Sequence, residues 1–253
     1  LITAYLLVRY KFLKPRISWS FKFIASVLKE SYPFAMAGLF TSIMLRIDTI
    51  ILKYFYTDEV VGLYNAAKRL IESTSFIPEN IAFALFPALS ALYFGNRERF
   101  NSTFQQSSEM MFILTIPITA GIFILAPQII KLLFTNEFNE ASIALRWLSL
   151  ALGLFFFKYI FAAVLNSMGK QLLLSLLFGL AMILNVILNY LLIPEYQLLG
   201  ASLATVITEF VIVLMTFFMC RKLLGLPLFS VKYLKTAILG IFIILFIYYF
   251  RNW

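Results

Sequence analysis

Long runs of apolar residues, separated by short polar segments, recur along the 253-residue chain. A membrane-spanning helix needs about 20 mostly apolar residues. On this template the pattern predicts the end of one helix, a series of complete spans, and no strand. We therefore expect an all-α integral membrane protein, a polytopic transmembrane helix bundle. The predicted helical ranges are Leu1–Val8, Pro33–Phe55, Val60–Phe94, Met110–Phe134, Ala141–Met168, Gln171–Ile193, Gly200–Cys220 and Tyr233–Tyr249.

The segments between these runs divide the chain into three parts. Residues 1–32 hold the end of a preceding helix and a basic, amphipathic, cytoplasmic or interfacial segment, part of which we expect along the membrane surface. Residues 33–220 form a transmembrane lobe of six helices, with a polar connector at 95–109, a tight turn at Gly169 and a loop at 194–199. Residues 221–253 form a loop and an additional helix. Because the chain opens on an apolar run that starts at Leu1, we expect a piece of a longer protein.

Composition narrows the class of protein. The chain is 62% hydrophobic and 13% charged, whereas soluble proteins are roughly half apolar and a quarter charged. It has no histidine and a single cysteine, Cys220. This excludes an intrachain disulfide, histidine metal sites and Ser-His-Asp catalysis, so we expect no cofactor and no enzyme activity. The net charge of +9 fits cytoplasmic loops of a membrane protein, and we expect no nucleic-acid partner.

The loop charges predict an orientation. Successive loops must alternate between the two sides of the membrane, and basic loops lie in the cytoplasm. One set of loops carries the acidic residues Asp58, Glu59, Glu137, Glu140 and Glu195. The other, cytoplasmic, set carries Arg9, Lys11, Lys14, Arg16, Lys22, Lys29, Arg97, Arg99, Lys170, Arg221, Lys222, Lys232 and Lys235.

The predicted helix Val60–Phe94 carries a polar stripe. Ionisable groups inside a membrane cost at least ~2.5 kcal/mol at its centre, so they face a bundle interior or a wet cavity. At about 100° per residue the polar positions fall on one face of this helix. The stripe consists of Asn65, Lys68, Arg69, Glu72, Glu79 and Asn80.

The preceding span carries two further charges. Arg46 and Asp48, two positions apart, point to nearly opposite sides and cannot pair with each other. Folding the chain back at Asp58 brings Asp48 level with Lys68, and we predict an interhelical ion pair there. The same fold brings Arg46 near Arg69 and Glu72, and Lys158 and Glu209 are the other deep charges. Buried pairs can also serve only to hold helices together, which remains the alternative for Asp48 with Lys68.

Three segments resemble a known family. Residues 185–205 read NVILNYLLIPEYQLLGASLAT, with Asn185 and Asn189 before Ile-Pro and a Gly-Ala helix start. Residues 46–52 and 61–70 read RIDTIIL and VGLYNAAKRL, and residues 127–134 read PQIIKLLF. In this order and spacing they are similar to the oligosaccharidyl-lipid (polysaccharide) flippases, within the superfamily that includes multidrug and toxic-compound extrusion transporters. The resemblance covers nearly the whole chain.

The resemblance implies a fold and a function. It implies the second lobe of a two-lobed transporter of the bacterial cytoplasmic (inner) membrane, with a missing N-terminal lobe as its partner and alternating access between the lobes. The implied cargo is an undecaprenyl-pyrophosphate-linked oligosaccharide for surface polysaccharides such as O-antigen. The candidate cavity residues are Arg46, Asn65, Lys68, Arg69, Asn80 and Lys158, and the candidates for charge pairing or for coupling to H⁺ or Na⁺ are Asp48, Glu72, Glu79 and Glu209.

Several other functions stay open at this stage. A multidrug or cation antiporter of the same superfamily predicts a more acidic, aromatic-lined cavity, while Lys68 and Arg69 favour an anionic ligand. A lipid II flippase is closer still. A membrane-embedded glycosyltransferase or polymerase needs acid, base or metal-binding groups near a membrane face, against which the short outer loops argue. A non-functional remnant is the last alternative.

Overall fold

The structure is an all-helical bundle, as the apolar pattern predicts. The computed structural model describes residues 20–225 and residue 240, and we find no strand among them. Their elements are α2 (Phe21–Phe55), α3 (Asp58–Gly95), α4 (Arg97–Leu133), a short 3-10 helix η1 (Asn136–Phe138), α5 (Ala141–Ser167) and α6 (Gln171–Leu224). All five α-helices are long and apolar enough to cross a membrane, so the expected fold class is confirmed. The predicted segments Leu1–Val8 and Tyr233–Tyr249 lie outside the described residues.

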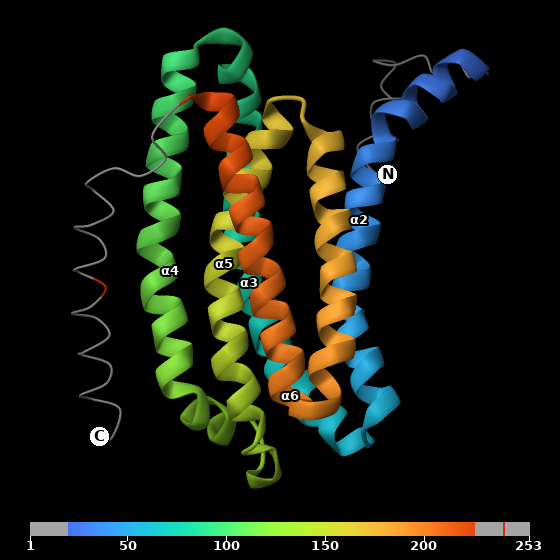
Figure 1. Ribbon diagram of the computed structural model, residues 1–253. Coiled ribbons are helices and arrows are strands. Elements are labelled where there is room, and N and C mark those ends of the chain that lie inside the picture. Colours follow the sequence, from blue (N-terminus) through green and yellow to red (C-terminus); the bar gives the residue numbers. More distant parts are fainter. Residues whose placement is uncertain (1–19, 226–239, 241–253) are drawn as a thin grey trace, which may run out of the picture.

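Helix α6 is a helical hairpin with a sharp kink between its two arms. Gln197 alone has non-helical backbone angles, with φ 51° and ψ −124°. Residues 171–196 and 198–224 run as two antiparallel arms on either side of it (Figure 1). They correspond to the predicted spans Gln171–Ile193 and Gly200–Cys220, and the loop expected between them shrinks to a sharp kink. The kink is tight because Gly200 has no side chain: a Cβ there would lie 2.3 Å from the Leu192 carbonyl oxygen.

Two helices begin earlier than the sequence pattern predicts. The polar segment 95–109 is expected as a connector, but its residues 97–109 are the first part of α4. Asn96 caps this helix by accepting a hydrogen bond from the Arg99 N–H at 3.0 Å, and Phe100 and Phe104 on its inner side are buried. The segment lacks a continuous apolar run because only one side of this helix is apolar and the other is polar. Helix α2 likewise starts at Phe21, where the Ser20 hydroxyl oxygen accepts from the Phe23 N–H.

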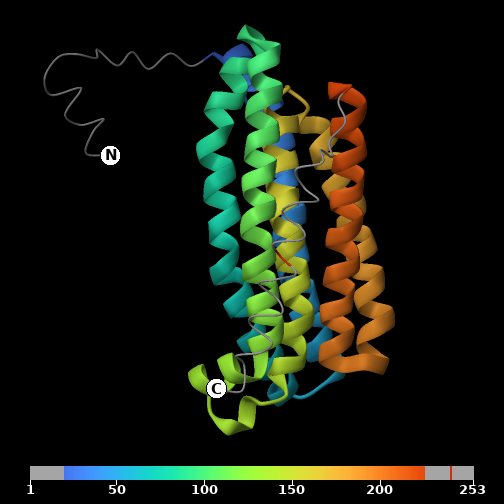
Figure 2. The same cartoon turned by 90° about the vertical axis from the view of Figure 1, so that its left-hand side faces the viewer.

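The packing order of the helices creates an internal space. Helix α5 lies at the centre, against α3, α4 and α6, and it is the most buried helix. Helix α2 packs mainly on α6 and touches its chain neighbour α3 only sparsely. Figures 1 and 2 show the resulting arrangement, with α3, α4 and α5 grouped together and α2 beside α6. Because α2 and α3 are splayed apart, polar side chains on both helices face the space between the two groups.

Candidate functional site

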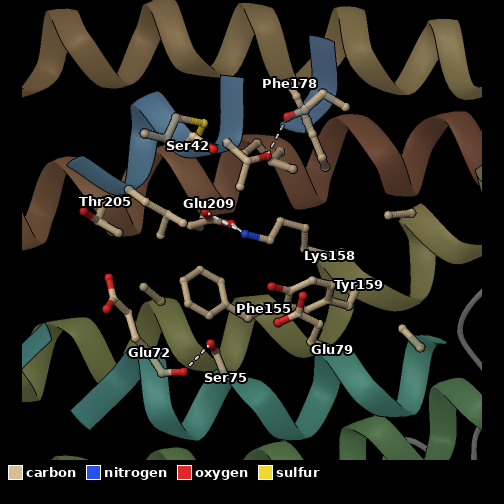
Figure 3. A pocket seen from close by; sticks show the side chains of 18 of the residues that line it. Ser42, Glu72, Ser75, Glu79, Phe155, Lys158, Tyr159, Phe178, Thr205 and Glu209 are labelled. Carbon is tan, nitrogen blue, oxygen red and sulfur yellow. Dashed lines mark hydrogen bonds and ion pairs between the residues drawn. The ribbon is translucent and has the colours of Figure 1, made fainter. Parts of the chain in front are cut away.

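A large cavity lies between α2 and α6 on one side and α3 and α5 on the other. Its volume is about 800 Å³, within the range of ~300–1,000 Å³ typical of small-ligand sites. Apolar and aromatic side chains make most of the wall, and Phe155, Tyr159 and Phe178 are among them (Figure 3). The charged members of the described lining are Arg46, Asp48, Lys68, Glu72, Glu79, Lys158 and Glu209.

The first ion pair in the cavity joins α2 to α3. Lys68 Nζ lies 2.7 Å and 2.8 Å from the two carboxylate oxygens of Asp48. The same ammonium donates to the Leu45 carbonyl oxygen, and the Tyr64 hydroxyl donates to Asp48 Oδ2 at 2.7 Å. The two charged side chains are only 11% and 3% exposed. The predicted pair is therefore confirmed, and its hydrogen bonds satisfy two charges that burial would otherwise penalise.

A second ion pair joins α5 to the second arm of α6. Lys158 Nζ lies 2.9 Å from Glu209 Oε1 and 2.9 Å from Oε2. These side chains are also largely buried, at 12% and 6% exposure. The Phe155 ring lies against the ammonium, with its centroid 4.1 Å from Nζ. Figure 3 shows Lys158 and Glu209 pointing toward each other from the two helices. The sequence marked both residues as deep charges without pairing them.

Three charged residues of the cavity stand outside these two pairs. Arg46 is exposed and lines the cavity, and we find no ion-pair partner for it among the described residues. Glu72 is also exposed and also lines the cavity. The carboxylate of Glu79 lies beside Tyr159, on the α3 side of the cavity (Figure 3).

The predicted polar stripe is divided between two environments. Lys68, Glu72 and Glu79 line the cavity, whereas Asn65, Arg69 and Asn80 are outside its lining. Asn65 accepts a hydrogen bond from the Thr49 hydroxyl at 3.2 Å, so it ties α3 to α2. Arg69 and Asn80 are exposed, and the Asn80 amide donates to the Phe76 carbonyl oxygen of its own helix. Only part of the stripe therefore faces the cavity. The structure therefore brings Arg46, Lys68 and Lys158 together, but not the other three cavity candidates.

Several lining residues were not singled out from the sequence. Tyr64, Tyr159 and Thr205 supply hydroxyls to the cavity, and Phe155 supplies a ring against Lys158. Tyrosine and phenylalanine are so frequent in this chain that composition gave no reason to choose these. Their signal was helical spacing: Tyr64 and Lys68, four apart, share a face, and so do Phe155 and Lys158, three apart.

Two buried asparagines lie in the first arm of the α6 hairpin, and one of them bonds to the second arm. Asn185 Nδ2 donates to the Thr208 hydroxyl at 3.2 Å, which links the first arm to the second. Asn189 Nδ2 donates to the Asn185 carbonyl oxygen at 2.9 Å. Asn185 therefore hydrogen-bonds across the hairpin, and it also lines the cavity.

The chain matches the model of a known protein family. The model of a family described as polysaccharide biosynthesis protein matches residues 1–143. The chain belongs to this family. The curated proteins similar to the chain include a probable low-salt glycan biosynthesis flippase of Haloferax volcanii, 28% identical over 71% of this chain and 38% of the relative. A putative O-antigen transporter of Shigella dysenteriae is 26% identical over 85% of this chain and 53% of the relative. The chain thus spans about half the length of the curated relatives it matches or less.

Solved structures share the fold of this family member. The lipid II flippase MurJ, in an inward closed conformation, matches with a TM-score of 0.75 and 18% identity over 98% of this chain and 53% of that one. An outward-facing multidrug resistance transporter of the MATE family matches with a TM-score of 0.72 and 19% identity over 84% of this chain and 49% of that one. At these identities the likeness establishes the fold alone. The fold is that of one half of a MOP superfamily transporter, as the resemblance implied. With its apolar helices and its membrane-transporter relatives, the chain is a multi-pass membrane protein.

Proposed function

We propose that this chain is one lobe of a flippase that carries an undecaprenyl-pyrophosphate-linked oligosaccharide across the cytoplasmic membrane by alternating access. The observation that carries the proposal is Arg46, an exposed guanidinium on a cavity wall whose other basic side chains are neutralised. A guanidinium binds phosphate oxygens in a bidentate geometry that an ammonium cannot match. Relatives named as a glycan flippase and an O-antigen transporter support the class of cargo.

The paired lysines supply the second step of the proposed mechanism. Arg46 makes the first contact with the pyrophosphate. The pyrophosphate oxygens then compete with Asp48 for Lys68 and with Glu209 for Lys158. Each ammonium already has a carboxylate partner, so the cavity without cargo contains no unpaired buried lysine. Binding of the cargo then replaces a carboxylate by a pyrophosphate oxygen as the partner of each lysine.

In this proposal the cavity carboxylates couple transport to H⁺ or Na⁺. A proton or Na⁺ that neutralises a cavity carboxylate removes one negative charge from the wall and so favours the state that holds the anionic cargo. Glu79 is the coupling candidate, because its carboxylate lies beside Tyr159 and not in either lysine pair. The lipid tail stays in the bilayer in this scheme and passes between two helices; α2 and α3, which pack only sparsely on each other, are the pair proposed for this passage.

The test is translocation by the intact protein in proteoliposomes, with a fluorescent undecaprenyl-pyrophosphate oligosaccharide whose arrival in the opposite leaflet is measured by a membrane-impermeant quencher. Replacing Arg46→Gln removes a charge-assisted phosphate contact and is expected to lower the initial rate roughly 10- to 100-fold. The matched control, Lys131→Gln, removes one positive charge from α4 outside the cavity lining and leaves the rate unchanged. A normal rate in Arg46→Gln contradicts the proposal.

The charge balance of the cavity supports a second candidate. The described lining holds three basic and four acidic side chains, so its formal charge is −1, and aromatic rings lie among them. This combination suits an organic cation, as the drug-exporter alternative predicts. Binding of a fluorescent organic cation that is displaced by other cations and weakened by Glu79→Gln favours export of cations, whereas displacement by pyrophosphate favours the flippase.

A further inference from the structure

The first twelve residues of α2, residues 21–32, form a helical extension whose side chains are all exposed. Pro33 is the first residue of the helix with a partly buried side chain. Figure 1 shows this end of α2 leaning out sideways from the bundle. Pro33 lies inside the helix, where a proline removes one backbone hydrogen bond and permits a bend. We call residues 21–32 the inner extension, because it lies at the end of α2 opposite to the acidic turn at Asp58.

The length of α2 requires part of it to leave the hydrocarbon core. Helix α2 has 35 residues, and at 1.5 Å per residue it is ~53 Å long. The hydrocarbon core of a bilayer is only ~30 Å thick. Because residues 33–55 are packed along α6 and already span that thickness, the inner extension lies at or beyond the membrane surface.

The inner extension has two chemically different faces. At about 100° per residue, Phe21, Ile24, Leu28 and Tyr32 fall on one side and are all exposed, with Phe21 at 91% and Leu28 at 64%. The opposite side carries the polar members Lys22, Ser26, Lys29 and Glu30. An amphipathic helix of this kind lies in the membrane interface with its apolar side toward the acyl chains and its lysines toward the headgroups.

The surroundings favour a lipid surface over water. An extension projecting straight into the cytoplasm would leave Phe21 and Leu28 fully hydrated, which is unfavourable for large apolar side chains. Basic residues also gather at this end of the bundle: Lys170 precedes α6, and Arg221 and Lys222 lie in its last turn. Anionic headgroups attract such basic residues.

We propose that the inner extension binds the surface of the membrane at the basic end of the bundle, with Phe21, Ile24 and Leu28 inserted among acyl chains and Lys22 and Lys29 on anionic lipid headgroups. This surface is separate from the cavity, and the proposal does not depend on what the cavity transports. The partner is an anionic phospholipid such as phosphatidylglycerol.

The experiment places an environment-sensitive fluorophore on one cysteine at a time, in the full chain with Cys220→Ser, reconstituted in nanodiscs. Ile24→Cys reports the apolar side and Ser26→Cys the polar side of the same turn. In nanodiscs with phosphatidylglycerol we expect a blue-shifted emission, quenched by spin-labelled lipid, at position 24 and a water-like emission at position 26. Combining Lys22→Gln with Lys29→Gln is expected to reduce the emission difference between the two positions. Each lysine removed is expected to lower the affinity of the inner extension for the anionic lipid surface roughly fivefold. Lys53→Gln, at the far end of α2, is the matched control and leaves the signal unchanged.

Three results overturn the proposal. Water-like emission at both positions means that the inner extension is solvated. Protection at both positions without quenching by spin-labelled lipid means that protein covers it. An identical signal in nanodiscs of neutral phosphatidylcholine means that anionic headgroups play no part.

Discussion

Lys158 of α5 and Glu209 of α6 lie 51 positions apart in the sequence, yet the ammonium of one lies 2.9 Å from the carboxylate of the other. This pair neutralises one of the two cavity lysines, and Asp48 neutralises the second. The cavity therefore presents paired charges rather than a bare basic surface.

Breaking the α5–α6 pair is expected to destabilise the protein. Glu209→Gln leaves the Lys158 ammonium buried without its counter-charge, and removing one partner of a buried pair costs about 3–5 kcal/mol. The double variant Lys158→Met with Glu209→Leu removes both charges and is expected to recover most of that loss. Thermal unfolding in detergent measures both effects. Equal destabilisation by the single and double variants would mean that the two side chains are not energetically coupled.

The Tyr64 hydroxyl is expected to hold Asp48 in place for Lys68. Tyr64→Phe removes the 2.7 Å hydrogen bond to Asp48 Oδ2 while keeping the buried ring, and a hydrogen bond to a charged group contributes about 1.5–3 kcal/mol. Asp48→Asn removes the counter-charge itself and is expected to cost more. The matched control is Tyr54→Phe on the exposed side of α2, which leaves the midpoint of thermal unfolding unchanged. A neutral Tyr64→Phe variant contradicts this role.

Gly200 is expected to be irreplaceable in the α6 hairpin. An added Cβ would lie 2.3 Å from the Leu192 carbonyl oxygen and 2.9 Å from the Ile193 nitrogen. Backbone atoms cannot rotate away as a side chain can, so Gly200→Ala must spread the two arms. Gly38→Ala is the control, because nothing lies within 4 Å of its Cβ position, and it is expected to be neutral or stabilising by about 0.5–1 kcal/mol. Similar unfolding midpoints for the two variants would show that the hairpin tolerates a wider kink.

Gln197 is expected to store strain that glycine relieves. Its φ of 51° with ψ of −124° is a conformation that side-chain-bearing residues rarely adopt, at a cost of about 1–3 kcal/mol. Gln197→Gly is therefore expected to stabilise the fold. Gln106→Gly, in the regular helix α4, is the control and is expected to destabilise by about 1 kcal/mol. Chemical denaturation of the two variants gives the comparison, and destabilisation by Gln197→Gly would refute the assignment of strain.

Much of the site follows from helix periodicity. The pairing of Asp48 with Lys68 was predictable because a tight turn at Asp58 fixes the register of two consecutive helices. The inclusion of Glu72 and Glu79 in the cavity followed from the face they share with Lys68. The exclusion of Arg69 and Asn80 from the cavity could not be predicted in this way. Helix periodicity shows which side of the helix is polar, but the packing of the neighbouring helices decides which residues of that side line the cavity.

The sequence by itself determined that the chain is a bundle of membrane helices, how the chain alternates between the two sides, and which charges are deep. These are local properties, because the length and polarity of each segment set its position in the bilayer. The tertiary structure alone decided that α2 packs on α6, that Lys158 meets Glu209, and that Arg46 remains without an ion-pair partner among the described residues. Such contacts join segments far apart in the chain, and they depend on which helices fit side by side, a choice that hydropathy leaves open.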